Sequence, residues 1–112
     1  MGDGPRIAAT KDAKANSPMR VVWTLQAQKN LLLVRHHIEN DNRKAAARIA
    51  NRLRMAAQRL AIHTESGRPG RVDSTRELVV PGTPYILPYR VRKDRVEILS
   101  VIHGAQKWPE NL

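Results

Sequence analysis

The segment GRPGRVDSTREL, residues 67–78, gathers arginines that could bind an anion. Arg68 and Arg71 flank a Pro-Gly pair typical of turns, and Arg76 follows at the start of an apolar run. The guanidinium group presents a fork of N–H donors that matches the oxygens of a phosphate. The spacing therefore predicts a stiff, positively charged turn that presents Arg68 and Arg71 to an anionic partner, with Arg76 beside them.

Two tyrosines and a histidine are candidates for further chemistry. Tyr85 and Tyr89 stand four residues apart in the strand-like run YILPYRVR, residues 85–92, so their side chains point to one face. Such tyrosines either stack on nucleic-acid bases or pack in the core. Tyr89 and His103 are the groups that could transfer a proton if the protein cleaves RNA, although His103 can equally be an ordinary residue at the end of a strand.

Arg90 lies on the opposite face of the same run and completes the set of arginines predicted to bind phosphate. No carboxylate is placed to act with these cations, because Glu77 is predicted to point away from its neighbour Arg76. The sequence has no cysteine, and the adjacent His36 and His37 face different sides of a predicted helix. A metal site is therefore not expected, and no cofactor is implied.

Net charge indicates the class of partner. The chain of 112 residues carries 20 Lys and Arg against 10 Asp and Glu, a net charge of +10. This excess predicts attraction to nucleic acid or to an acidic protein. No stretch is long and apolar enough to span a membrane, and the N-terminus lacks the apolar core of a signal peptide. A cytoplasmic protein with no membrane partner is expected.

The chain divides into two parts. Residues 1–18 are small, polar and aperiodic, which predicts a disordered N-terminal extension. Residues 19–112 are expected to form a single domain. It begins with a β-branched and aromatic run over residues 20–24, which predicts a strand.

The order of the remaining elements predicts an α+β fold. Two helices over about residues 25–40 and 43–63, with Thr24 and Asn42 as N-caps, are joined by so short a turn that they must form an antiparallel hairpin. Short connections predict that the three strands after it form an antiparallel meander. These strands span residues 75–80, 85–92 and 95–104. Pro88 lacks an N–H, so a bulge or a missing ladder hydrogen bond is expected in the middle strand. The helical hairpin is expected to cover one face of the sheet.

The second helix also carries a basic stripe beside its apolar face. The stripe consists of Lys44, Arg48, Arg52 and Arg59. At 100° per residue, these side chains cluster within about 80° of one another. A stripe of this kind is either a solvated helix face or a second surface for an anionic partner.

Several blocks of the sequence resemble the RelE/ParE superfamily, the bacterial toxins of type II toxin–antitoxin modules. The blocks are GRPGRVDSTREL, TPYILPYRV and ILSVIHGAQKWP, after an Ala-rich second helix, and the resemblance covers about residues 19–109. It implies the order strand, helix, helix and three strands. It also implies a toxin that arrests growth and assembles with an acidic antitoxin. Modules of this kind are associated with plasmid stabilisation.

The resemblance leaves two targets open. RelE-like members cleave mRNA on the ribosome without a metal, whereas ParE-like members inhibit DNA gyrase. RelE-like nucleases often carry lysines before and within the second strand, and this chain has none between Lys44 and Lys93. The long helical hairpin also resembles the ParE-like branch. Gyrase inhibition is therefore the favoured function, and ribosome-dependent mRNA cleavage is the alternative. A third possible function is that of a non-catalytic basic module that binds nucleic acid.

Overall fold

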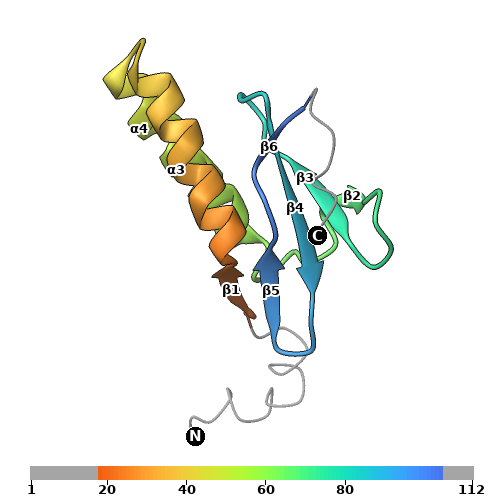
Figure 1. Ribbon diagram of the computed structural model, residues 1–112. Helices are drawn as coiled ribbons and strands as arrows, with labels where there is room; N and C mark the ends of the chain where they lie inside the picture. The colour runs from red at the N-terminus through yellow and green to blue at the C-terminus, as the bar shows by residue number, and fades with distance from the viewer. Residues whose placement is uncertain (1–17, 105–112) are drawn as a thin grey trace, which may run out of the picture.

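A computed structural model describes residues 18–104 of the chain (Figure 1). The elements are β1 (Arg20–Trp23), α3 (Leu25–Glu39), α4 (Arg43–Arg59), β2 (Arg68–Pro69), β3 (Arg76–Val79), β4 (Tyr85–Val91), β5 (Arg95–Ile98) and β6 (Ile102–His103). They confirm the predicted strand, helical hairpin and strand meander. The predicted N-terminal extension, except Pro18, lies outside the described residues.

Both predicted helix starts are confirmed. The Thr24 hydroxyl accepts a hydrogen bond from the Ala27 N–H at 3.1 Å, and the Asn42 carboxamide accepts one from the Ala45 N–H at 3.0 Å. Each bond satisfies one of the backbone donors that the first turn of a helix leaves without a partner. The two caps define a hairpin whose helices lie side by side (Figure 1).

The end of α4 differs from the prediction. The helix ends at Arg59 rather than near His63. Its last turn tightens, because the Ala61 N–H bonds to the Gln58 carbonyl, three residues back, at 3.0 Å. The Ala61 carbonyl then accepts from the Met19 N–H at 2.8 Å, which ties the end of the hairpin to the start of β1.

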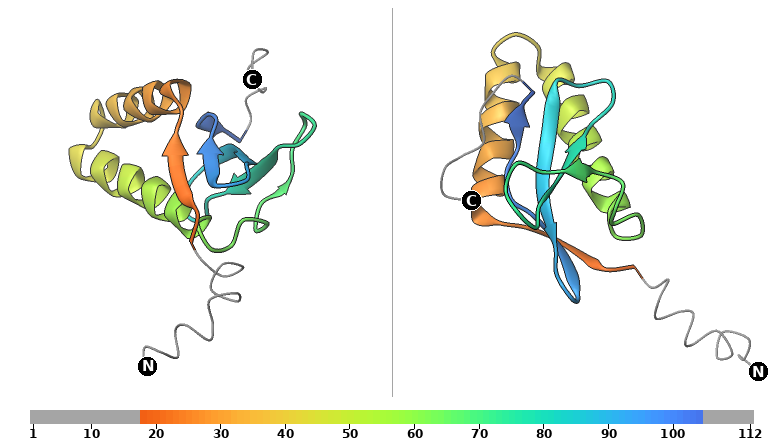
Figure 2. Two further views of the ribbon diagram at one scale, coloured as in Figure 1. Left: turned by 90° about the horizontal axis from the view of Figure 1, so that it is seen from below. Right: turned by 90° about the vertical axis from the view of Figure 1, so that its right-hand side faces the viewer.

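The strands form one sheet in the order β1-β5-β4-β3-β2, and β6 also pairs with β4. β1 runs parallel to β5, and all other pairs are antiparallel. The hairpin covers one face of this sheet, as expected (Figure 2). The core between the two layers includes Ala27, Leu31, Ala50, Leu53, Ala57, Leu60, Leu87, Tyr89, Val96 and Ile98.

The last predicted strand, residues 95–104, is divided into β5 and β6 by a bulge opposite Pro88. Tyr89 pairs with Ile98 and Ile86 with Ile102, so residues 99–101 lie opposite only Leu87 and Pro88. The Pro88 carbonyl accepts from the Leu99 N–H at 2.8 Å, which shows that the donor-less nitrogen of Pro88 also faces this side. The missing donor explains why the ladder breaks here.

The arginine-rich segment is only partly the turn that was predicted. Arg68 and Pro69 form the edge strand β2, opposite Glu77 and Arg76 of β3. The loop between β2 and β3 is closed by a 2.8 Å bond from the Gly70 N–H to the Thr75 carbonyl. This pairing decides which of the predicted arginines share a surface.

Candidate functional site

Arg76 does not join the other predicted phosphate-binding arginines. On β3 it shares the helix-covered face with Leu78, which packs against the core, and it pairs with the buried Tyr89. Its guanidinium donates to the Gly67 carbonyl at 2.7 Å. Arg76 therefore braces the loop that follows α4.

Tyr89 is fully buried, and its hydroxyl is bonded on both sides. The hydroxyl donates to the Thr64 carbonyl at 2.8 Å and accepts from the Gly67 N–H at 2.9 Å. Burial raises the pKa of Tyr89, against the opposing effects of the Gly67 hydrogen bond and the charge of Arg76. A Cβ on residue 67 would lie 2.6 Å from the Tyr89 ring, so only glycine fits there. This geometry supports the interpretation of Tyr89 as a core aromatic.

His103 lies at the other end of β4 from Tyr89. It pairs with Tyr85 across β4 and β6, and the edge of one ring meets the other ring at 5.7 Å between centroids. Tyr85 is itself buried. Four residues of strand, about 13 Å, separate Tyr85 from Tyr89. The structure therefore does not bring the two candidate proton carriers together.

Arg68 and Arg71 do come together, around a carboxylate. Glu77 is only 3% exposed, and it lies 2.9 Å from Arg68 and 3.5 Å from Arg71. Both arginine side chains stay about half exposed, at 55% and 50%. Glu77 points away from Arg76, as predicted, and thereby orients the other two arginines. We call Arg68, Arg71 and Glu77 the first triad.

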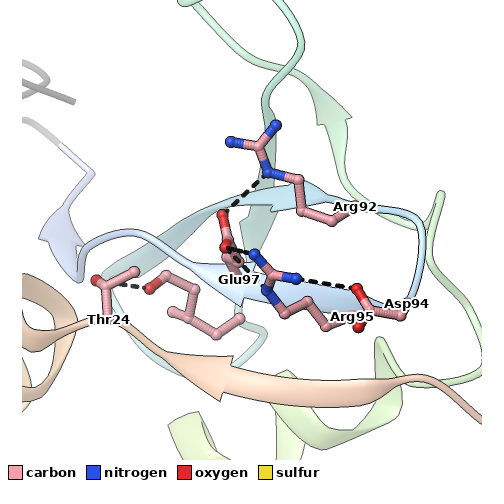
Figure 3. A network of polar contacts seen from close by, with 6 residues as sticks. Thr24, Arg92, Asp94, Arg95 and Glu97 are labelled. Carbon is pink, nitrogen blue, oxygen red and sulfur yellow. Dashed lines mark hydrogen bonds and ion pairs between the residues drawn. The ribbon is translucent and has the colours of Figure 1, made fainter.

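A second triad consists of Arg92, Arg95 and Glu97, beside the turn between β4 and β5 (Figure 3). Glu97 accepts from Arg92 at 3.4 Å and from Arg95 at 3.0 Å, and Arg95 also bonds to Asp94 at 2.9 Å. Burial alone raises the pKa of Glu97, but the hydrogen bonds from Arg95 and Arg92 outweigh it and lower the pKa. Glu97 is therefore ionised at neutral pH and holds both arginines.

Arg90 connects the two triads. It pairs with Glu97 across β4 and β5, and Pro88, two residues before it, pairs with Glu77. Paired residues of an antiparallel ladder point to the same side, so both triads and Arg90 share the sheet face turned away from the helices. We call this surface the open face.

Sequence reasoning found only part of the open face. It identified Arg68, Arg71 and Arg90 but gave no role to Glu97 or Arg95. The signal was present in RVRKDRVE, residues 90–97, where alternation on each side of the turn places arginines and a glutamate on one face. The strand register needed to join these residues to Glu77 is not visible in the sequence.

The basic stripe of α4 borders a groove. Arg48, Arg52 and Arg59 line a hollow of about 610 Å³ between α4 and the end of β3, whereas Lys44 lies outside it. Arg52 also donates to the Pro81 carbonyl at 3.1 Å, which fastens α4 to the turn between β3 and β4. A second hollow of about 250 Å³ continues the groove toward His63. The apolar part of the lining comprises Met55, Ala56, Leu78, Val79, Val80 and Pro81.

Residues 18–104 contain neither a helix that could span a membrane nor a candidate metal cluster. Neither helix in this part combines the length and apolar character needed to cross a membrane. No group of three or more His, Asp or Glu side chains there could hold a metal ion. The chemistry of the described surfaces is that of arginines, with apolar side chains in the groove.

Comparison with known families decides the class of the protein. Residues 21–108 match the family of the ParE toxin of the type II toxin–antitoxin system parDE. The chain belongs to this ParE toxin family. The toxin is 49% identical to the protein named putative toxin Y4kP of Sinorhizobium fredii, over 86% of this chain and 99% of that protein. It is 37% identical to toxin RelE2 of Caulobacter vibrioides, over 78% of this chain and 97% of that protein.

Solved structures agree on the fold. A chain of the chromosomal ParDE system from P. aeruginosa superposes with a TM-score of 0.70 at 23% identity, covering 76% of the toxin and 95% of that chain. A chain of the toxin–antitoxin complex RelBE2 from Mycobacterium tuberculosis has a TM-score of 0.52 at 26% identity, covering 80% of the toxin and 94% of that chain. The α+β fold expected of RelE/ParE toxins is thus confirmed.

Proposed function

We propose that the toxin arrests growth by inhibiting DNA gyrase. The observation that supports this most is the position of the groups that a nuclease would need. Cleavage of RNA requires proton carriers placed together at the scissile phosphate. Tyr89 is buried with its hydroxyl bonded twice, His103 lies at the far end of β4, and Arg76 is bonded to the loop backbone.

A test in cells separates this function from its alternative. The full chain is expressed from an inducible promoter, and plasmid topology and mRNA integrity are followed in the same culture. We expect plasmids to lose negative supercoiling while mRNA stays intact. Ribosome-dependent cleavage, the alternative, gives cut mRNA with normal topology. Unimpaired growth with normal plasmid topology and intact mRNA contradicts both mechanisms.

His103→Ala sharpens the comparison. A nuclease that uses His103 to transfer a proton loses on the order of 10²-fold or more in cleavage rate. A gyrase inhibitor that does not use His103 to transfer a proton keeps its potency. We expect retained toxicity in this variant, with circular dichroism as the control for folding.

We also propose that an acidic antitoxin binds in the groove along α4. The solved relatives from P. aeruginosa and M. tuberculosis come from toxin–antitoxin systems, which supports a partner of this kind. The groove combines an apolar floor with Arg48 and Arg59 at its rim, so it suits the apolar face and acidic edges of an amphipathic segment. Both this partner and gyrase are cytoplasmic, which is the location we propose for the toxin.

Charge reversal in the groove tests the antitoxin site. Arg48→Glu combined with Arg59→Glu should weaken binding of the cognate antitoxin by 100-fold or more, because two attractive contacts become repulsive. Arg54→Glu combined with Arg43→Glu is the matched control, since both are exposed positions of α4 outside the groove lining. Equal losses in the two variants, measured by calorimetry, contradict the groove as the binding site.

A further inference from the structure

The open face uses one arrangement twice. In each triad a carboxylate lies beneath two arginines whose guanidinium groups reach solvent. Glu77 and Glu97 are 3% and 17% exposed, whereas the four arginine side chains are 35–55% exposed. The carboxylate, buried in the first triad and half-buried in the second, fixes the direction of the guanidinium forks. Each triad keeps a net charge of +1 because two cations meet one anion. Asp94, the further acid near Arg95, is itself within 3.8 Å of Arg20.

The two triads are spaced across the sheet. Glu77 is opposite Pro88 and Glu97 is opposite Arg90, on the two sides of β4. Two strand spacings, about 10 Å, therefore separate the carboxylates across the sheet, and two residues, about 7 Å, separate them along it. Arg90, half-buried, stands between them. The result is an extended row of oriented cations rather than a pocket for one small anion.

The tryptophan and the two tyrosines of residues 18–104 lie on the other face. Trp23 pairs with Ile98 and packs against the core, and Tyr85 and Tyr89 belong to the core beneath the helices. Within residues 18–104 the open face thus offers no ring on which an unpaired base could stack. Proteins that bind single strands rely on such rings, whereas contacts from arginine to phosphate suffice to bind a duplex backbone.

We infer that the open face binds the phosphate backbone of duplex DNA, without reading its sequence. This deepens the proposed inhibition of gyrase and rests on it for its biological role, because the gyrase reaction acts on duplex DNA. The first triad, Arg90 and the second triad each place guanidinium donors toward the phosphates. Arg76 and the stripe of α4 take no part, since they lie on the helix side of the sheet.

Binding of a fluorescent 20-base-pair DNA to the full chain tests the inference without gyrase. The variant Arg68→Gln/Arg92→Gln removes one arginine from each triad and leaves each carboxylate its second partner, which protects the fold. We expect at least tenfold weaker binding at 0.1 M salt. The slope of the logarithm of the binding constant against the logarithm of the salt concentration should also become shallower, by roughly 0.9 for each of the two lost phosphate contacts. Arg43→Gln/Arg54→Gln, with the same loss of charge on exposed positions of α4, should change the Kd less than twofold.

Three results would overturn the inference. They are equal losses in both double variants, absence of DNA binding by the unmodified protein, and tighter binding of a single-stranded RNA than of the duplex. Arg90→Gln serves as a second variant if Arg68→Gln/Arg92→Gln unfolds, and it should weaken binding at least threefold. Gyrase inhibition is measured separately: variants that lose DNA binding yet inhibit gyrase fully would confirm the DNA site, contradict its role in gyrase inhibition and leave the proposed function standing.

Discussion

Single side chains in this toxin connect segments that are distant in sequence. Tyr89 of β4 bonds to both Thr64 and Gly67, and Arg76 of β3 bonds to the same glycine from its carbonyl side. The loop after α4 is thus held by a phenol and a guanidinium. These residues position the β2 edge, and through it the first triad, so they affect the open face without lying on it.

Tyr89→Phe tests this role. The change leaves the Gly67 N–H and the Thr64 carbonyl without their buried partner, which should cost about 1–3 kcal/mol of unfolding free energy. Tyr85→Phe is the control, because the Tyr85 hydroxyl forms no hydrogen bond within residues 18–104, and it should cost under about 0.5 kcal/mol. Urea denaturation measures both. Loss of toxicity without loss of stability in Tyr89→Phe would indicate a chemical role instead.

The ionisation of Glu97 predicts a pH dependence. Its pKa is lower in the folded protein than in the unfolded chain, since Arg92 and Arg95 bond to the ionised carboxylate. The stabilisation is therefore complete above the unfolded pKa, about 4.3, and is lost as the pH falls through the folded value. Glu97→Gln should flatten this part of the curve of unfolding free energy against pH. An unchanged slope below pH 5 would refute the assignment.

At the scale of elements, α3 is attached to the sheet at two points. The Thr24 hydroxyl caps the helix and also donates to the Ile98 carbonyl at the end of β5, at 2.9 Å. One turn and a half later, the Asn30 carboxamide accepts from the Ser100 hydroxyl and the Val101 N–H, at 2.6 and 3.2 Å. Asn30 thereby satisfies backbone and side-chain donors that the bulge opposite Pro88 leaves outside the ladder.

Thr24→Ala should destabilise the fold more than the loss of an ordinary cap. A cap alone is worth about 1 kcal/mol, and the lost bond to Ile98 adds about another 1 kcal/mol. Thr24→Ser keeps the hydroxyl and should lie within about 0.5 kcal/mol of the unmodified protein. Thermal unfolding followed by circular dichroism compares the two. A Thr24→Ala variant as stable as Thr24→Ser would show that the hydroxyl does not join the layers.

The sequence predicts elements well because their signals are local. Thr24 and Asn42 are recognisable as caps, and strand alternation places Arg90 and Tyr89 on opposite faces. The candidate site depends on strand register and loop paths, which are not local. The hydrogen bond from Arg76 to the Gly67 carbonyl depends on the position of Tyr89, and no sequence pattern near Arg76 indicates this bond. The predicted disordered extension and the sites themselves stay predictions.

At the scale of the whole molecule, arginines of residues 18–104 gather on two surfaces. The groove along α4 lies on the helix side of the sheet, and the open face lies on the other side. The groove has an apolar floor suited to a protein segment, whereas the open face consists of arginines held by one buried and one half-buried carboxylate. We therefore propose antitoxin binding and nucleic-acid binding on different sides of the same small domain.

The central claim, gyrase inhibition, is tested most directly with purified components. Relaxed plasmid, ATP and DNA gyrase are mixed with increasing amounts of the full-length toxin, and the supercoiled product is resolved on agarose. In parallel, the toxin is added to ribosomes translating a defined mRNA. Our account predicts dose-dependent loss of supercoiled product, reversal by the cognate antitoxin, and uncut mRNA. Undiminished supercoiling at a tenfold molar excess of toxin over gyrase, together with cleaved mRNA, would contradict it.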